Sequence, residues 1–147
     1  MHLTNFKLSN FKTYEDLDVD FCSNVNCLVG NNGAGKTNLL DAIYYLSFCK
    51  SYFNAIDTQN IRQGSEFFAV HGTYMFEHES VLVSCIQKKS LPKQVRWNKK
   101  AYKTFGEHIG RIPLVIVSPN DQNIINGGSD VRRKFMDGVI SQTNKGY

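Results

Sequence analysis

The strongest chemical pattern in the sequence is a glycine-rich run, Gly30-Asn31-Asn32-Gly33-Ala34-Gly35-Lys36-Thr37. It has the spacing GxxxxGK[ST], in which the backbone N–H groups of a loop enclose phosphate oxygens. The lysine of such a loop binds the β- and γ-phosphates, and the hydroxyl that follows it is a ligand for Mg²⁺. We therefore predict that all eight residues bind ATP and that Thr37 also binds Mg²⁺.

The flanking sequence predicts the strand and the helix that such a loop requires. Val25–Val29 (VNCLV) is a short apolar run typical of a buried strand. A helix should run from Lys36 to about Phe48, with Leu39, Leu40, Ile43, Leu46 and Ser47 on one face. Its free N–H groups and positive dipole end would add to the attraction for an anion.

The remaining pattern predicts an α/β fold with a mixed sheet and an antiparallel β-meander. Period-two alternation and turn residues indicate strands at 2–8, 14–21, 67–76, 81–86 and 94–97. Residues 102–109 indicate a short helix, and Pro113–Val117 a second buried strand. A last helix should begin near Ser129, a favourable N-cap.

Composition limits the class of protein. The 147 residues suit one domain, and 41% hydrophobic and 20% charged residues are ordinary for a globular chain. No apolar run approaches the ~20 residues of a membrane span, and the N-terminus lacks the features of a secretory signal. The four cysteines form no CxxC pair, which argues against zinc and favours reduced thiols in the cytoplasm.

The positive charge is concentrated in one stretch. No acidic residue occurs between Ser80 and Gly106, and this stretch includes Trp97 and Tyr102 among its basic residues. Those basic residues are Lys88, Lys89, Lys93, Arg96, Lys99, Lys100 and Lys103. Cations beside aromatic rings suit a DNA backbone, so we predict DNA contact here; a solvated hairpin face is the alternative.

Two segments resemble a known family. Leu8–Tyr14 (LSNFKTY) followed by the glycine-rich loop resembles the opening of SMC-like heads among the ABC-type ATPases, a branch that includes RecF. Pro119–Asp137 (PNDQNIINGGSDVRRKFMD) resembles a signature of the RecF family itself. The segment departs from that signature at Asn120, where an acid is usual, and at Ser129, where proline is usual.

The resemblance implies that residues 1–147 form the first lobe of a RecF-like ATPase head. In the family, ATP lies between two heads of a homodimer, and the protein acts on DNA at single-strand gaps and stalled forks with RecO and RecR. The Walker B strand and the signature motif of such heads lie downstream of this sequence. We therefore expect a truncated lobe that binds ATP weakly and hydrolyses it very slowly.

The resemblance also implies individual roles for residues outside the loop. Lys12 would touch a nucleotide phosphate, and Asn38 would add a polar contact. Asp121 or Gln122 would sense Mg²⁺, and Ile61–Arg62 would lie near the adenine. A solvated turn lysine is the alternative for Lys12, and a turn-forming asparagine is the alternative for Asn38. The roles of two basic residues near the C-terminus, Arg132 and Arg133, stay open between DNA, a head interface and a plain helix surface.

Three other classes of protein compete with this interpretation. A different SMC-like DNA-repair head would not account for residues 119–137. A small P-loop kinase or GTPase would need no long meander before the second buried strand, and the sequence has no guanine-reading NKxD. A non-catalytic DNA-binding module with a vestigial loop would bind no nucleotide.

Overall fold

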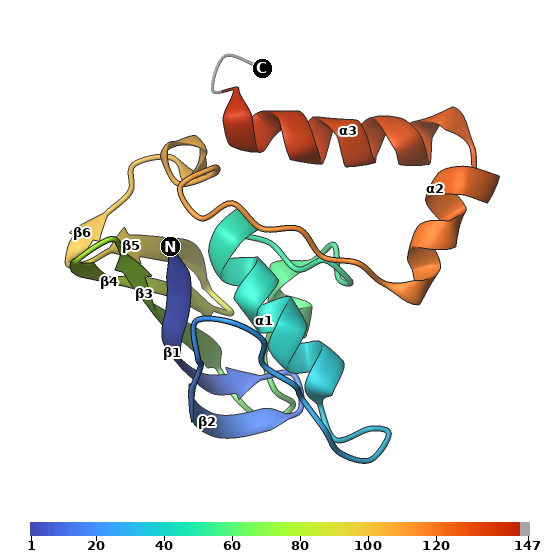
Figure 1. Ribbon diagram of the computed structural model, residues 1–147. Helices are drawn as coiled ribbons and strands as arrows, with labels where there is room; N and C mark the ends of the chain where they lie inside the picture. Colours follow the sequence, from blue (N-terminus) through green and yellow to red (C-terminus); the bar gives the residue numbers. More distant parts are fainter. Residues whose placement is uncertain (145–147) are drawn as a thin grey trace.

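The computed structural model describes residues 1–144, apart from the side chains of Asn120 and Asn123, and its centre is a six-stranded sheet (Figure 1). The strands lie in the order β2-β1-β3-β4-β5-β6, and all neighbours in this sheet are antiparallel. Their bounds are β1 His2–Phe11, β2 Tyr14–Asp20, β3 Phe67–Phe76, β4 Glu79–Lys88, β5 Leu91–Trp97 and β6 Lys100–Ala101. The predicted antiparallel meander is confirmed.

One long helix lies between β2 and β3 in the chain and packs against the sheet, and two further helices follow the last strand. They are α1 Lys36–Phe48, α2 Gln122–Asn126 and α3 Ser129–Thr143, with short 3-10 helices η1 Asp57–Asn60, η2 Phe105–Glu107 and η3 Pro119–Asp121. The predicted bounds of α1 and the predicted start of α3 are confirmed, whereas the short helix predicted at 102–109 is reduced to η2. Within the described residues, no helix combines the length and the apolar character needed to cross a membrane.

Alternation along the strands gives the sheet a core face, which α1 covers, and an outer face. Phe6 and Leu8 of β1 point to the core and have at most 1% of their surface exposed. Lys7, between them, points outward, and its ammonium lies 2.7 Å from the carboxylate of Asp18 on β2. The period of two thus places the apolar side chains against the helix and the ionised ones in solvent.

The core is an aromatic cluster between α1 and the strands. Tyr45 of α1 meets Phe11 and Phe68 edge-on, with ring centroids 6.1 and 5.2 Å apart. All three rings are fully buried, and so is Leu46, the next residue of the helix. Edge-to-face pairs of this kind stabilise a core beyond the area they bury, so this cluster fixes α1 against the sheet.

Two segments predicted as buried strands are not strands, so that part of the prediction is wrong. Val25–Val29 and Pro113–Val117 are extended, and neither pairs with a strand among residues 1–144. Their valines are strongly exposed, from 73% at Val115 to 89% at Val29. A strand buries such a run only where neighbouring strands cover it, and the described residues provide no such neighbours.

Candidate functional site

The glycine-rich loop forms an open turn that leads directly into α1. Gly30, Gly33 and Gly35 all have positive φ, of 153°, 83° and 94°. Two features favour glycine at position 35: the backbone is left-handed there, and a Cβ would lie 3.0 Å from the ring of Tyr14. Residues 30–34 are exposed, so the loop is accessible to a ligand.

Lys36 is the first residue of α1, and its side chain reaches back to the loop. Its ammonium donates hydrogen bonds to the carbonyl oxygens of Gly30 and Asn31, at 2.6 and 2.7 Å. The side chain therefore folds back over the loop instead of extending into solvent. An ammonium in this position can attract an anion to the loop, and phosphate oxygens can replace the two carbonyls as acceptors.

The first turn of α1 suits an anion. It contains no acidic residue, and Gly35 caps it without a competing side-chain hydrogen bond. Its unsatisfied N–H groups and the positive end of the helix dipole therefore face the loop. Thr37 is exposed in this turn, and the amide of Asn38 donates a 2.9 Å hydrogen bond to the hydroxyl of Thr13.

The β1–β2 turn places Lys12 beside α1 and contacts residues 60–62. Lys12 has φ 52°, and its backbone N–H donates to the carbonyl of Asn60 at 2.8 Å. Ile61 bridges to Phe11, and Arg62 pairs with Glu15 at 3.1 Å. The side chain of Lys12 is 12% exposed, and its ammonium lies 2.5 Å from the buried carboxylate of Asp41.

The two candidate magnesium-sensing residues are not near the loop. Gln122 is exposed on α2, which Figure 1 shows apart from the loop that precedes α1. Asp121 accepts hydrogen bonds from the hydroxyl of Tyr52 and the backbone of Ser118, both at 2.7 Å. The bond from Tyr52, more than that from Ser118, holds the pKa of Asp121 below its ordinary value.

The seven basic residues predicted to contact DNA do not form one surface. Lys93 turns to the core side, where its ammonium is 2.7 Å from Asp57 and 3.2 Å from the hydroxyl of Tyr45. Burial raises the pKa of Tyr45, so that hydroxyl stays protonated and also donates to Asp57. Lys89 pairs with Glu66 at 2.9 Å. The remaining five, Lys88, Arg96, Lys99, Lys100 and Lys103, are exposed.

The aromatic residues of this stretch face inward. The guanidinium of Arg111 lies 5.2 Å from the ring centroid of Trp97 and 5.4 Å from that of Tyr102. Trp97 also packs on Phe76, with centroids 5.4 Å apart. These rings already have a cation and a core neighbour, so they are not free platforms for nucleic-acid bases.

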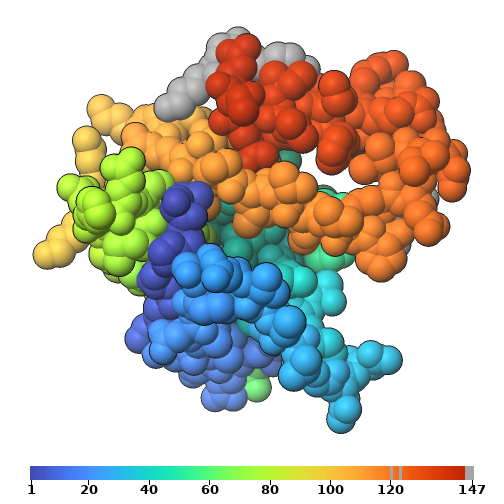
Figure 2. Space-filling model, in the orientation of Figure 1, coloured from blue at the N-terminus to red at the C-terminus, as the bar shows by residue number. Residues whose placement is uncertain are grey.

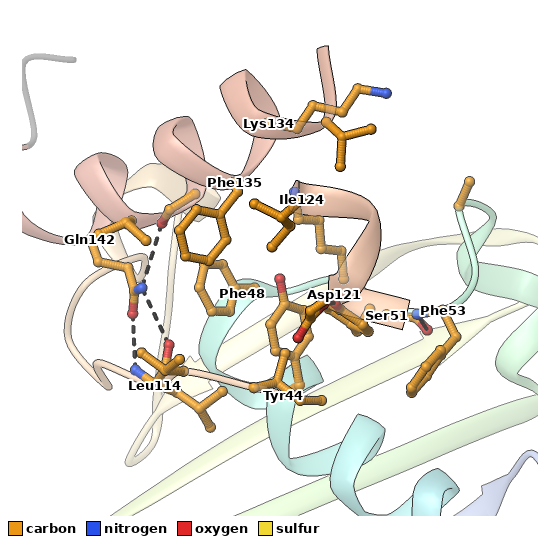
Figure 3. Close-up of a pocket in the computed structure, with 18 of the residues that line it drawn as sticks. Tyr44, Phe48, Ser51, Phe53, Leu114, Asp121, Ile124, Lys134, Phe135 and Gln142 are labelled. Atoms are coloured by element: carbon orange, nitrogen blue, oxygen red, sulfur yellow. Dashed lines mark hydrogen bonds between the residues drawn. The ribbon is translucent and has the colours of Figure 1, made fainter. Parts of the chain in front are cut away.

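A cavity of about 740 Å³ lies between the C-terminal half of α1 and the pair α2 and α3, and Figure 2 shows the surface hollowed there. Its lining is largely aromatic and aliphatic, including Tyr44, Phe48 and Phe135 (Figure 3). Gln142 of α3 bonds both backbone groups of Leu114, at 2.9 and 3.3 Å, and so ties α3 to the extended run that crosses the cavity.

Sequence reasoning missed Asp41. The apolar face predicted for α1 does not include this residue, yet it is fully buried, whereas Leu40, which that face includes, is 48% exposed. The position of Asp41 in the helix could have indicated its burial, because it lies between Leu39 and Ala42, which are both buried. A buried carboxylate needs partners, and Lys12, Ser51 and the backbone of Tyr52 provide them.

The chain is similar to known proteins over nearly its whole length. A family model described as an AAA domain matches residues 5–140. A protein of Phocaeicola vulgatus described as DNA replication and repair protein RecF is 51% identical over 148 aligned residues, which cover 100% of this chain and 40% of that protein. The corresponding protein of Flavobacterium johnsoniae is 48% identical, with 100% and 41% coverage. The chain thus spans about two fifths of the length of these relatives.

Solved structures agree with these relatives. A structure of the recombination mediator protein RecF-ATPrS in the RecFOR pathway superposes with a TM-score of 0.93 at 31% identity, over 99% of this chain and 40% of that one. A structure from work on ATP-driven dimerisation and DNA-stimulated activation of SMC ATPases gives a TM-score of 0.75 at 17% identity, over 95% and 99%. At that identity the second likeness concerns the fold alone.

Proposed function

The chain belongs to the AAA-domain family and to the RecF proteins of DNA replication and repair, and we propose that residues 1–147 are the ATP-binding lobe of a RecF-type head. The observation that carries the proposal is the loop at 30–37. Three glycines with positive φ, an ammonium held over the loop and a helix start without acidic residues make a site for a triphosphate.

Magnesium fits this site through one protein ligand. Mg²⁺ is commonly held by one or two protein oxygens together with water and the phosphates of the nucleotide. The exposed Thr37 hydroxyl at the start of α1 can serve as that oxygen. Gln122 stands apart from the loop, so its assignment to the metal would require α2 to move.

Calorimetric titration of the chain with ATP and Mg²⁺ tests the proposal. We expect the wild-type chain to bind, and Lys36→Ala to weaken binding by at least about tenfold, since a hydrogen bond to a charged group contributes about 1.5–3 kcal/mol. Lys50→Ala is the matched control, because Lys50 is exposed just beyond the other end of α1. A folded wild-type chain that binds no ATP, or equal affinities for wild type and Lys36→Ala, would refute the proposal.

The wider role that we propose is that of a cytoplasmic RecF protein. Two heads would close on ATP as a homodimer, bind DNA at single-strand gaps and stalled forks, and cooperate with RecO and RecR. The family supports these roles for a complete protein. Hydrolysis would require the second head and the parts of the relatives that this chain does not span.

The exposed lysines around the β5–β6 turn are the part of this chain that we propose for DNA contact. Lys99, Lys100 and Lys103 lie close in sequence and are exposed, whereas Lys93 is excluded by its ion pair. Phosphate contact by lysines releases counterions, so affinity should fall steeply with salt.

Replacing these three lysines by glutamine should weaken binding to a gapped duplex and lower the salt slope by up to about 3, roughly one for each phosphate that a lysine no longer neutralises. Fluorescence anisotropy over a series of salt concentrations measures both quantities. A triple glutamine variant of Arg132, Arg133 and Lys134 on α3 removes the same charge. If both triple variants lower the DNA affinity equally, net charge alone determines binding. If only the α3 variant lowers it, the DNA-binding surface lies on α3 and the proposal for the β5–β6 turn is wrong.

A further inference from the structure

Three successive residues, from Lys12 in the β1–β2 turn to Tyr14 at the start of β2, lie along the N-terminal part of α1 and its cap. The ring of Tyr14 lies against Gly35, and the hydroxyl of Thr13 accepts the bond from Asn38. The ammonium of Lys12 meets Asp41. The contacted positions 35, 38 and 41 follow each other at intervals of three, which places them on one side of the helix.

The carboxylate of Asp41 is held from several directions. Its Oδ2 accepts hydrogen bonds from the ammonium of Lys12 at 2.5 Å and from the hydroxyl of Ser51 at 2.6 Å. Its Oδ1 accepts from the backbone N–H of Tyr52 at 2.7 Å. No part of Asp41 is exposed, so this carboxylate is a fixed acceptor beneath Lys12.

The position of Lys12 is equally restricted. Its ammonium lies 5.4 Å from the ring centroid of Phe53 and 5.8 Å from that of Phe11. Of its three N–H donors, one is used by Asp41. Asp41 follows Thr37 by four residues, about 6 Å along the axis, and helix side chains lean toward the N-terminus. The ammonium therefore lies beside the first two turns of α1, the helix that follows the loop.

We propose that Asp41 is a positioning residue of the phosphate site, which fixes Lys12 so that the free donors of its ammonium bind a nucleotide phosphate while the ion pair persists. This inference rests on the proposed ATP binding. Because Asp41 keeps Lys12 throughout, no buried carboxylate is left without a partner when nucleotide binds. The nucleotide then meets two cations, Lys36 over the loop and Lys12 at the side of α1.

The test is a cycle of ATP affinities measured by calorimetry with Mg²⁺. Lys12→Met and Asp41→Asn should each weaken ATP binding by about fivefold to tenfold, as the loss of one charge-assisted hydrogen bond would. The double variant should bind ATP as Lys12→Met does, since Asp41 acts through Lys12. Asp57→Asn is the matched control, because it breaks another ion pair beside α1 and should leave ATP affinity within about twofold of wild type.

Several outcomes would overturn the inference. If Asp41→Asn weakens binding equally in the wild-type and Lys12→Met backgrounds, its role is structural. If it changes nothing while Lys36→Ala still weakens binding, the inference fails and the proposed function survives; absence of any wild-type binding refutes both. If Asp41→Asn does not fold, the side-chain ¹⁵N signal of Lys12 in the wild-type chain decides, since it should shift on adding ATP while that of Lys50 does not.

Discussion

Replacing Lys93 by methionine is expected to lower the free energy of unfolding by about 2–4 kcal/mol. The ammonium is the donor that joins Asp57, the hydroxyl of Tyr45 and the carbonyl of Cys49 beneath the sheet. The side chain of Lys93 is only 8% exposed, whereas that of Asp57 is 34% exposed. Water can therefore partly solvate Asp57, so the loss of stability should be smaller than for a fully buried ion pair.

Urea denaturation of the two proteins measures this loss. Lys88→Met is the control, because Lys88 is exposed at the end of the neighbouring strand and its removal should change stability by less than about 0.5 kcal/mol. If Lys93→Met were instead as stable as wild type and bound DNA less tightly, Lys93 would belong to the DNA-binding surface predicted from its charge. The ion pair with Asp57 would then make no measurable contribution to stability.

Replacing Phe68 by alanine should cost about 3–5 kcal/mol of stability. Phe68 is fully buried, and its ring meets Phe11 and Tyr45 edge-on at 5.1 and 5.2 Å. Removing it leaves a cavity between β3 and α1 that neither neighbouring ring can fill, because each is fixed on its own element.

The adjacent residue provides the matched control. Phe67 lies on the same strand but faces outward and is 39% exposed. Phe67→Ala should therefore cost no more than about 1 kcal/mol in the same denaturation experiment. Equal losses for the two variants would mean that α1 does not depend on the aromatic cluster for its place on the sheet.

The parts of the fold that depend on local sequence could be predicted. The loop at 30–37 and the bounds of α1 follow from glycine spacing and helical periodicity, and β3 follows from alternation between turn residues. These signals operate over a few residues, so they need no knowledge of distant contacts.

The main failures involve partners far away in the chain. Val25–Val29 and Pro113–Val117 have the composition of buried strands, but burial depends on neighbours that residues 1–144 do not provide. Lys12 and Lys93 look like surface lysines, but Asp41 lies 29 positions from the first and Asp57 36 positions from the second. A charge count along the sequence cannot separate a solvated lysine from one whose counter-ion is supplied by another element.

We expect the extended run at 113–117 to promote association between copies of this chain. Val115 and Val117 point outward, at 73 and 84% exposure, from a backbone that has no strand partner in the described residues. Branched side chains on an unpaired extended backbone are a template for strand addition between molecules, the first step of amyloid-like assembly. A polypeptide that covered this run would therefore protect the chain from self-association as well as pack against it.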